Sequence, residues 1–372
     1  MLALAPTRMF TGSEILEGHT VHISEGRILD ITTATSPAAI KLDGLLAPGF
    51  IDIQVNGGGG VLFNDSPTVD TLETIGAAHA RFGVTGFMAT LISDDRDKIA
   101  QAIDAVAEAI EDEVEGVLGL HLEGPWLSDP RRGVHPSRHL RSLDDEDVRL
   151  LAQKRRFPLM ITVAPEQVNV ETIETLKTAG VIISLGHTEA PAEQVEAALS
   201  AGASGFTHLF NAMPPMEGRK PGPVGVALAN RDCWAGLILD GIHVSPTSAR
   251  AAFAAKTWRK LMLVSDAMAT VGSNDPRMSL FGERIEVKEG ALRTAAGTLA
   301  GAHLDLSMAV RNAVSLLGAT PTEALRMASL TPAEFLGVAA VRGRMGAGCL
   351  ADFVLLDDNL NPKATWIGGN RL

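Results

Sequence analysis

Gly119–Trp126, with the sequence GLHLEGPW, decides the fold, and two later stretches repeat its pattern. These are ISLGHTEA at residues 183–190 and GFTHLFNAM at residues 205–213. In each stretch a short apolar run, which predicts a buried strand, leads to a residue that can bind a metal. These residues are Glu123, His187 and His208. A fourth run, LMLVSD, ends in Asp266. Because the parallel strands of a barrel end at one face, we expect the four side chains to form one cluster.

The residue types in this cluster favour a metal site. Two imidazoles and one carboxylate leave a coordination position open, which is the composition of a catalytic divalent-metal site. A single His or Glu at a strand end is more often a hydrogen-bonded polar residue than a ligand. Four such residues, each closing a separate apolar strand, make coincidence much less common, so the pattern predicts a metal centre.

The composition is that of a soluble enzyme. The 372 residues suffice for one large α/β domain and a small one, and 46% of them are hydrophobic. The net charge of −12 argues against nucleic acid or an anionic membrane as a partner. Cys233 and Cys349 form no metal motif and no disulfide framework, which suits a reducing cytosol. The sequence shows no signal-peptide pattern and no apolar run of membrane-spanning length, so we expect a cytoplasmic protein.

Apolar runs alternate with helical patterns from residue 50 onward. Runs of strand length lie at 50–55, 84–92, 116–122, 159–163, 181–185, 205–207, 234–239 and 261–264. Between two of them, Ile99, Ile103 and Val106 recur at helical spacing, which predicts a helix that covers the sheet. Eight strands that mostly alternate with helices are the pattern of a (β/α)₈ barrel.

Both ends of the chain show strand patterns and predict a second, smaller unit. We assign residues 1–47 and 341–372 to this β domain and residues 48–340 to the barrel. Residues 279–298 predict a β excursion with a turn at Glu289-Gly290.

Individual residues mark helix starts and one turn. Ser66, Thr320 and Thr331 each precede proline, which predicts an N-cap followed by the first helical residue. Four glycines at 57–60 predict a flexible turn. A phosphate-binding loop is the weaker interpretation there, because no Gly-Lys-Ser/Thr follows.

Seven motifs, taken in order, resemble the N-acetylglucosamine-6-phosphate deacetylase family of the amidohydrolase superfamily. They are PGFIDIQVNGGGG, GLHLEGPW, ISLGHTEA, THLFNAMPPMEGRKPG, LILDGIH, LVSDAM and TLAGAHLDL. The resemblance covers nearly the whole chain. It implies a (β/α)₈ barrel with a small β-sandwich built from both termini, a metal-dependent amide hydrolase, a phosphorylated amino sugar as substrate, and a homodimer.

One position separates this sequence from most of the superfamily. Where the superfamily has His-x-His after the first barrel strand, this chain has Gln54-Val55-Asn56. Neutral amides are poor ligands for zinc or iron, so a second ion loses its main anchors. We therefore expect one divalent ion per chain, held by Glu123, His187 and His208. Zinc suits these ligands best, and Fe²⁺, Co²⁺ or Mn²⁺ also suit them.

The resemblance also implies roles for other residues. Asp266 matches the family's catalytic Asp, which acts first as base and then as acid. His135 matches a histidine near the acetyl group that stabilises the oxyanion. The residues implied to bind substrate are Val134, His135, Asn211, Ala212, Arg219, His243, Leu299, Ala300 and Gly301. Arg219 is a candidate to serve the active site of the partner subunit.

Two other functions remain open at this level. An amidohydrolase could act on another N-acyl compound or a cyclic amide, and a binding protein on this fold could lack catalysis. The absence of His-x-His argues against two-metal enzymes, and Arg219 with His243 argues for a phosphate. Retention of all three predicted ligands and of Asp266 argues against a binding protein.

Overall fold

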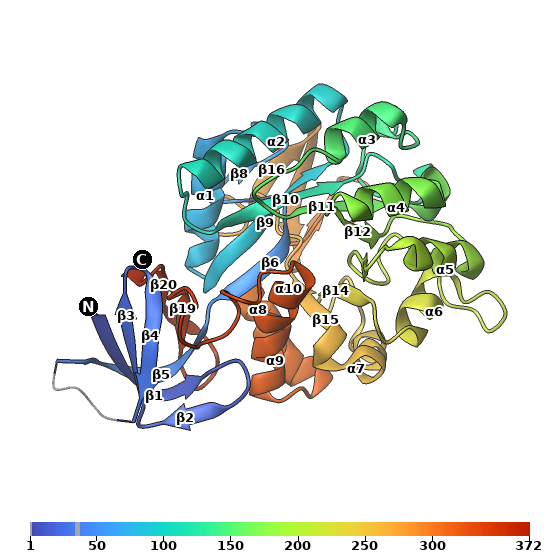
Figure 1. Cartoon of the computed structure of the whole chain (residues 1–372). Helices are drawn as coiled ribbons and strands as arrows, with labels where there is room; N and C mark the ends of the chain where they lie inside the picture. Colours follow the sequence, from blue (N-terminus) through green and yellow to red (C-terminus); the bar gives the residue numbers. More distant parts are fainter. Residues whose placement is uncertain (1, 34–37) are drawn as a thin grey trace.

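The protein is described by a computed structural model that covers residues 2–33 and 38–372 (Figure 1). Eight parallel strands form its central sheet: β6 (Phe50–Val55), β9 (Val84–Ile92), β10 (Val117–Glu123), β11 (Leu159–Val163), β12 (Ile182–Leu185), β13 (Gly205–Phe206), β14 (Trp234–Ile238) and β15 (Leu261–Val264). Each strand pairs with the next one along the chain. A parallel bridge between Val55 and Ala267 joins the first strand to the segment that follows the last one, which nearly closes the barrel. The predicted barrel is confirmed.

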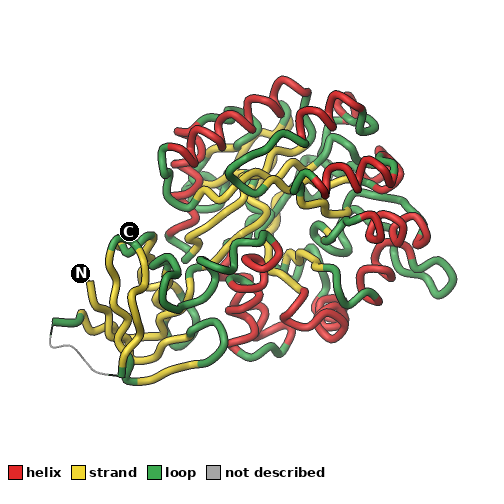
Figure 2. Tube along the Cα trace, viewed as in Figure 1, coloured by secondary structure: helices red, strands yellow, loops and turns green. Residues whose placement is uncertain are grey.

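Helices lie around the outside of this sheet (Figure 2). They are α1 (Val69–Ala80), α2 (Arg96–Glu111), α3 (Asp145–Leu151), α4 (Val170–Thr178), α5 (Ala192–Ala201), α6 (Gly222–Ala229), α7 (Pro246–Lys260), α8 (Leu306–Asn312), α9 (Pro321–Met327) and α10 (Leu330–Phe335), with short helical turns η1 (Asp129–Arg131), η2 (Ser137–His139), η3 (Pro165–Gln167) and η4 (Ala313–Leu317). The apolar stripe of α2, including Ile99, Ile103 and Val106, is buried in the barrel core, as its spacing predicts. In the described residues no helix is long and apolar enough to cross a membrane.

Of the three helix N-caps predicted from a residue before proline, one is confirmed and two are wrong. The Thr320 cap is confirmed, because its hydroxyl accepts from the Glu323 N–H in a capping box. The Ser66 cap is wrong: the helix starts after Thr68, whose side chain accepts a hydrogen bond from the Thr71 N–H. The Thr331 cap is also wrong, because its hydroxyl instead donates to the Trp258 carbonyl.

Strands from both ends of the chain join in a second sheet. Its members are β1 (Leu2–Phe10), β2 (Ile15–Glu17), β3 (Thr20–Ser24), β4 (Arg27–Thr32), β5 (Ile40–Pro48), β19 (Phe353–Leu356), β20 (Pro362–Ile367) and β21 (Asn370–Arg371). β5 lies between β1 and β19, so the sheet needs both termini. It encloses its own core, which includes Leu46, Phe353 and Trp366. The terminal β domain is thus confirmed as part of the fold. Its exact boundaries remain predictions, and residues 1 and 34–37 of the assigned segment lie outside the described residues.

Two small hairpins complete the barrel's loops. β7 (Gly57–Gly58) pairs with β8 (Val61–Leu62), which makes the glycine run a tight turn. A Cβ at Gly57 would lie 2.4 Å from the Val61 carbonyl oxygen, so only glycine fits there. β16 (Arg277–Leu280), β17 (Glu283–Lys288) and β18 (Ala291–Arg293) form the predicted excursion, with its turn at Glu289-Gly290.

Candidate metal centre and active site

The four predicted residues meet at the carboxyl ends of the barrel strands. Glu123 is the last residue of β10, and His187, His208 and Asp266 each follow their strand by two residues. The latter three have left-handed backbone conformations, with φ of 48°, 29° and 50°. Such conformations are unfavourable for residues other than glycine and cluster at functional sites. The chain therefore turns sharply after each of these strands.

Three of these side chains have atoms within ligand distance of one another. Glu123 Oε1 lies 3.2 Å from His187 Nε2 and 2.9 Å from His208 Nε2, and the two Nε2 atoms are 3.0 Å apart. Ligands about 2.0 Å from a tetrahedral ion lie roughly 3.3 Å from each other, so this spacing fits one shared cation. All three residues are at least 95% buried. The donor set and its spacing fit a divalent metal.

The second nitrogen of His187 supports its role as a ligand. Its Nδ1 lies 2.7 Å from the Arg131 carbonyl oxygen, which can only accept a hydrogen bond. Nδ1 therefore carries a proton in the neutral ring, and the Nε2 lone pair faces the cluster. Histidines that bind metals commonly donate their other N–H to a carbonyl in this way.

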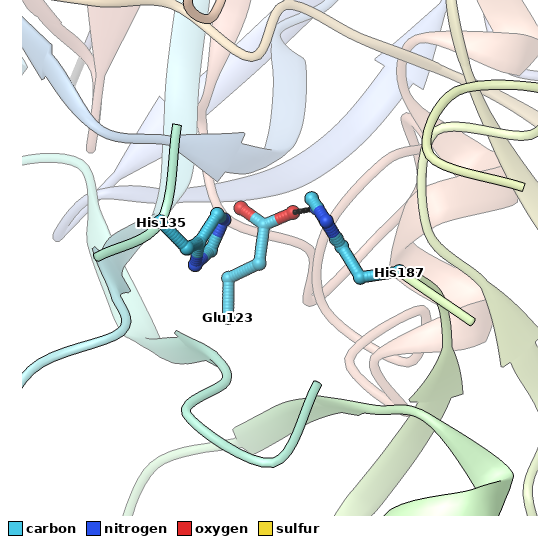
Figure 3. A group of neighbouring side chains, drawn as sticks. All are labelled: Glu123, His135 and His187. Carbon is cyan, nitrogen blue, oxygen red and sulfur yellow. Dashed lines mark hydrogen bonds and ion pairs between the residues drawn. The ribbon is translucent and has the colours of Figure 1, made fainter. Parts of the chain in front are cut away.

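His135 lies beside the same cluster and forms an alternative triad (Figure 3). Glu123, His135 and His187 each offer an atom, and these atoms lie within 4.8 Å of one another. The Glu123 carboxylate lies between the two rings. His208 Nε2 lies 2.9 Å from Glu123 and 3.0 Å from His187, well within the 4.8 Å that relates the atoms of the His135 triad. Distance therefore favours His208 as the third ligand. His135 Nδ1 is engaged with Ser93, 2.8 Å from its hydroxyl oxygen.

The two amides that replace His-x-His hold the carboxylates directly. Gln54 Nε2 donates to both oxygens of Glu123, at 3.2 and 3.1 Å, and to Asp266 Oδ1 at 3.2 Å. Asn56 Nδ2 donates to the same Asp266 oxygen at 2.7 Å. Amide N–H groups thus donate to the carboxylates at the two positions where the superfamily that the sequence resembles usually has histidines. This arrangement gives a physical reason to expect a single ion.

Burial and neighbouring charges set the protonation of the site. Burial, with the negative charge of Glu123, raises the pKa of Asp266 to about 6. Burial acts to raise the pKa of Glu123 too, but hydrogen bonds and charges from His187 and His208 lower it well below its usual range. Burial opposes the charged form of His208, yet its contact with Glu123 raises the pKa of His208 overall. Of the two carboxylates in the cluster, Asp266 rather than Glu123 is therefore able to exchange a proton near neutral pH.

A cavity of about 170 Å³ opens onto the cluster and contains most of the predicted substrate residues. Those that line it are Val134, His135, Asn211, Ala212, His243, Leu299 and Gly301. Ala300 instead packs in the core beneath the β16–β18 hairpins. Arg219 is exposed and lines a separate hollow on the loop before α6. The structure thus places Ala300 and Arg219 outside this cavity.

A larger hollow lies elsewhere on the protein. It has a volume of about 700 Å³ and lies between α1 and β20, lined in part by Ala77, Ala80 and Lys363. None of the clustered histidines or carboxylates lines it. Size therefore does not identify the site, and the convergence of titratable groups does.

His243 is held by a carboxylate that sequence reasoning did not assign. Asp240 Oδ2 lies 2.6 Å from His243 Nδ1, and Asp240 Oδ1 accepts from the backbone N–H groups of Ile242 and His243. Burial opposes ionisation of Asp240, but these hydrogen bonds lower its pKa. The pair leaves His243 Nε2 available to a ligand in the cavity.

Comparison with known proteins gives the family. Residues 45–372 match the family described as "Amidohydrolase family". This chain belongs to the amidohydrolase family. The N-acetylgalactosamine-6-phosphate deacetylase of Shewanella sp. (strain ANA-3) is 43% identical over 100% of this chain and 96% of its own length. The N-acetylglucosamine-6-phosphate deacetylase of Rattus norvegicus is 36% identical over 99% of this chain and 96% of its own length. The crystal structure of N-acetylglucosamine-6-phosphate deacetylase from Pasteurella multocida has a TM-score of 0.95 at 31% identity over 100% of both chains.

This amidohydrolase is therefore an enzyme, as expected from the resemblance, and a hydrolase. Sequence reasoning missed Ser93 and Asp240, which support the two cavity histidines His135 and His243. Ser93 and Asp240 each follow a barrel strand within two residues. A search for polar residues at strand ends, which located Glu123, would therefore also have found them. Sequence reasoning also missed the apolar lining of this amidohydrolase's cavity, which includes Ile92, Ile238 and Met268.

Proposed function

We propose that this chain hydrolyses the acetamide of N-acetylglucosamine 6-phosphate, giving glucosamine 6-phosphate and acetate. The observation that carries the proposal is the buried cluster of Glu123, His187, His208 and Asp266 at the mouth of an amidohydrolase barrel. The names of full-length relatives support the substrate class.

The metal would be held by Glu123, His187 and His208, one ion per chain, and zinc suits this donor set best. When bound, such an ion lowers the pKa of water and polarises a carbonyl. The amide contacts of Gln54 and Asn56 support a single ion, because these side chains act as donors to the carboxylates.

Asp266 would carry out the proton transfers, and His135 would stabilise the developing negative charge. Asp266 takes the proton of the attacking water and later gives one to the departing amine, because a free amine is a poor leaving group until it is protonated. Its raised pKa, about 6, suits both steps. His135 donates a hydrogen bond to the carbonyl oxygen as negative charge develops there.

The phosphate would be bound by His243 and by Arg219. His243 lines the cavity, while Arg219 is on an exposed loop outside it. We infer that Arg219 reaches the active site of a second copy in a homodimer, since it cannot be counted among the residues of its own cavity. A planar guanidinium matches phosphate oxygens in paired hydrogen bonds.

N-acetylgalactosamine 6-phosphate is a second candidate substrate. The relative with 43% identity is named for that sugar, whereas the rat relative with 36% identity is named for the glucosamine derivative. The two sugars differ only at the C4 hydroxyl, which is remote from the acetamide, so the same chemistry serves both. We also infer a cytoplasmic enzyme, because Cys233 and Cys349 are free and buried.

A substrate panel tests the proposal. Acetate release is measured for both phosphorylated sugars, for unphosphorylated N-acetylglucosamine and for a cyclic amide, on protein of known metal content. We expect turnover of a phosphorylated sugar at a rate that tracks metal content. Turnover of only the cyclic amide would favour the alternative amidohydrolase, and bound sugar without acetate release would favour a binding protein.

A further inference from the structure

Ser93 follows β9 directly and makes two contacts with one nitrogen of His135. Its backbone N–H donates to His135 Nδ1 at 3.2 Å, and its hydroxyl oxygen lies 2.8 Å from the same atom. Both residues are buried, Ser93 completely. We propose that Ser93 is a positioning residue that fixes the tautomer of His135, so that His135 acts as an Nε2–H donor and stays off the metal. This inference rests on the proposed function for its catalytic part only.

The tautomer follows from which groups can donate. A backbone N–H can only donate, so His135 Nδ1 must accept and carries no proton. The ring is then neutral, because the charged form carries protons on both nitrogens, and its one proton is on Nε2. The Ser93 hydroxyl must donate to Nδ1 as well. Its other contact, the Glu123 carbonyl oxygen at 3.5 Å, is much longer.

This tautomer decides between the two geometrically available triads. His135 and His208 both lie beside Glu123 and His187. A ring nitrogen that carries a proton has no lone pair in the ring plane for a cation. His135 is therefore left to donate to a ligand oxygen in the cavity, and His208 becomes the third metal ligand. The neighbouring ring of His187, with its centroid 4.6 Å away and its plane inclined by 61°, limits the space in which His135 can reorient.

The motif that decides the fold also makes room for Ser93. A Cβ at Gly124 would lie 2.3 Å from the Ser93 hydroxyl oxygen, and Gly124 has φ of +83°. Glycine directly after Glu123 is therefore required by the hydroxyl beside it as well as by the backbone. The ligand Glu123 and the serine that orients His135 are thus packed against one another.

Nuclear magnetic resonance tests the tautomer without using activity. In zinc-loaded protein with ¹⁵N-labelled histidine, the two His135 signals are assigned by their loss in His135→Gln. We expect a protonated Nε2 and an unprotonated Nδ1. A protonated Nδ1 in the native protein would overturn the proposal, whatever the variants do.

Kinetics test the consequence. Ser93→Ala removes the hydroxyl and keeps the backbone N–H, so we expect kcat to fall about 3- to 10-fold, the effect of one hydrogen bond. KM and metal content should be unchanged, and Ser93→Thr should restore kcat.

Ser329→Ala is the matched control, since the Ser329 hydroxyl is also fully buried but donates to the carbonyl oxygen of Leu325 in α9. Native kcat in Ser93→Ala would refute the positioning role. Absence of any deacetylation by the native enzyme would instead refute the proposed function, while the tautomer measurement would still decide on Ser93.

Discussion

Two groups of predicted site residues occupy very different surroundings. Glu123, His187, His208 and Asp266 are each at least 91% buried at the ends of barrel strands. Arg219 is exposed on the proline-rich loop between Met213 and α6. The first group is positioned by the strands of the barrel sheet. The second cannot be positioned by its own barrel, because its loop extends away from the core (Figure 1).

This difference teaches how the two halves of the substrate would be recognised. Under the proposed function, the reacting amide would meet groups whose spacing the sheet fixes to within hydrogen-bond distance, as catalysis requires. The phosphate is remote from the reacting bond and can be bound by a side chain on a loop. Changes in the strand-end cluster should therefore affect rate, and changes in the loop should affect substrate affinity.

Removing the metal should have the largest effect. We expect a chelator to abolish turnover and one equivalent of Zn²⁺ per chain to restore it, since Glu123, His187 and His208 form one site. Metal analysis and activity during re-addition check this. A requirement for two ions per chain would contradict the argument from Gln54 and Asn56.

Asp266→Asn should lower kcat by roughly 10²–10⁴-fold, the usual contribution of general acid–base catalysis. The asparagine oxygen can still accept from Asn56 and Gln54, so the cluster should keep its shape and its metal. Turnover, metal content and affinity for a substrate analogue are measured together. Asp275→Asn, at an exposed position, is the control. Loss of metal in Asp266→Asn would show that Asp266 is a ligand first.

Arg219→Ala should raise KM for the phosphorylated sugar by roughly 10- to 100-fold, the range expected for hydrogen bonds to a charged group. It should affect unphosphorylated N-acetylglucosamine far less. Lys220→Ala is the matched control, because Lys220 is exposed on the same loop. Equal losses on both sugars would assign Arg219 to the loop or the dimer instead, and would remove the contrast between the two regions.

The pH profile gives the smallest effect and sharpens the assignment of Asp266. The base must be ionised, so kcat/KM should fall about tenfold per pH unit below its pKa. That pKa is about 6 from burial and Glu123, and a cation beside it lowers it further. We therefore expect an acid limb at or below pH 6. A limb centred above pH 7 would assign it to a group other than Asp266.

The barrel was predictable because its signals are local and repeated. Each apolar run of three to nine residues indicates a buried strand, and eight such runs specify the architecture. The clustering of these side chains was predictable for the same reason, since Glu123, His187 and Asp266 each follow a run; their roles as ligands and base remain predictions. The Ser66 cap was mispredicted because Thr68, two residues later, caps the helix instead, and the Thr331 cap because that hydroxyl donates to the Trp258 carbonyl, 73 residues away.

The roles of the supporting residues were harder to predict than their positions, because these roles depend on partners far along the chain. Ser93 matters through His135, 42 residues away, and Gln54 through Asp266, 212 residues away. Neither pairing has a sequence pattern. The placement of Arg219 outside the cavity likewise depends on the course of a loop that no periodicity describes.

The bridge between Val55 and Ala267 has a consequence for biosynthesis. Glu123, His187 and His208 have all been translated long before residue 267, whereas Asp266 arrives together with the residue that closes the barrel. Its hydrogen-bond partners, Gln54 and Asn56, are by then more than 200 residues upstream. A nascent chain thus gains the candidate metal ligands first and the candidate base Asp266 later, together with the residue that bridges to the first strand. Under the proposed function, we expect hydrolytic activity only once Val55 and Ala267 have paired.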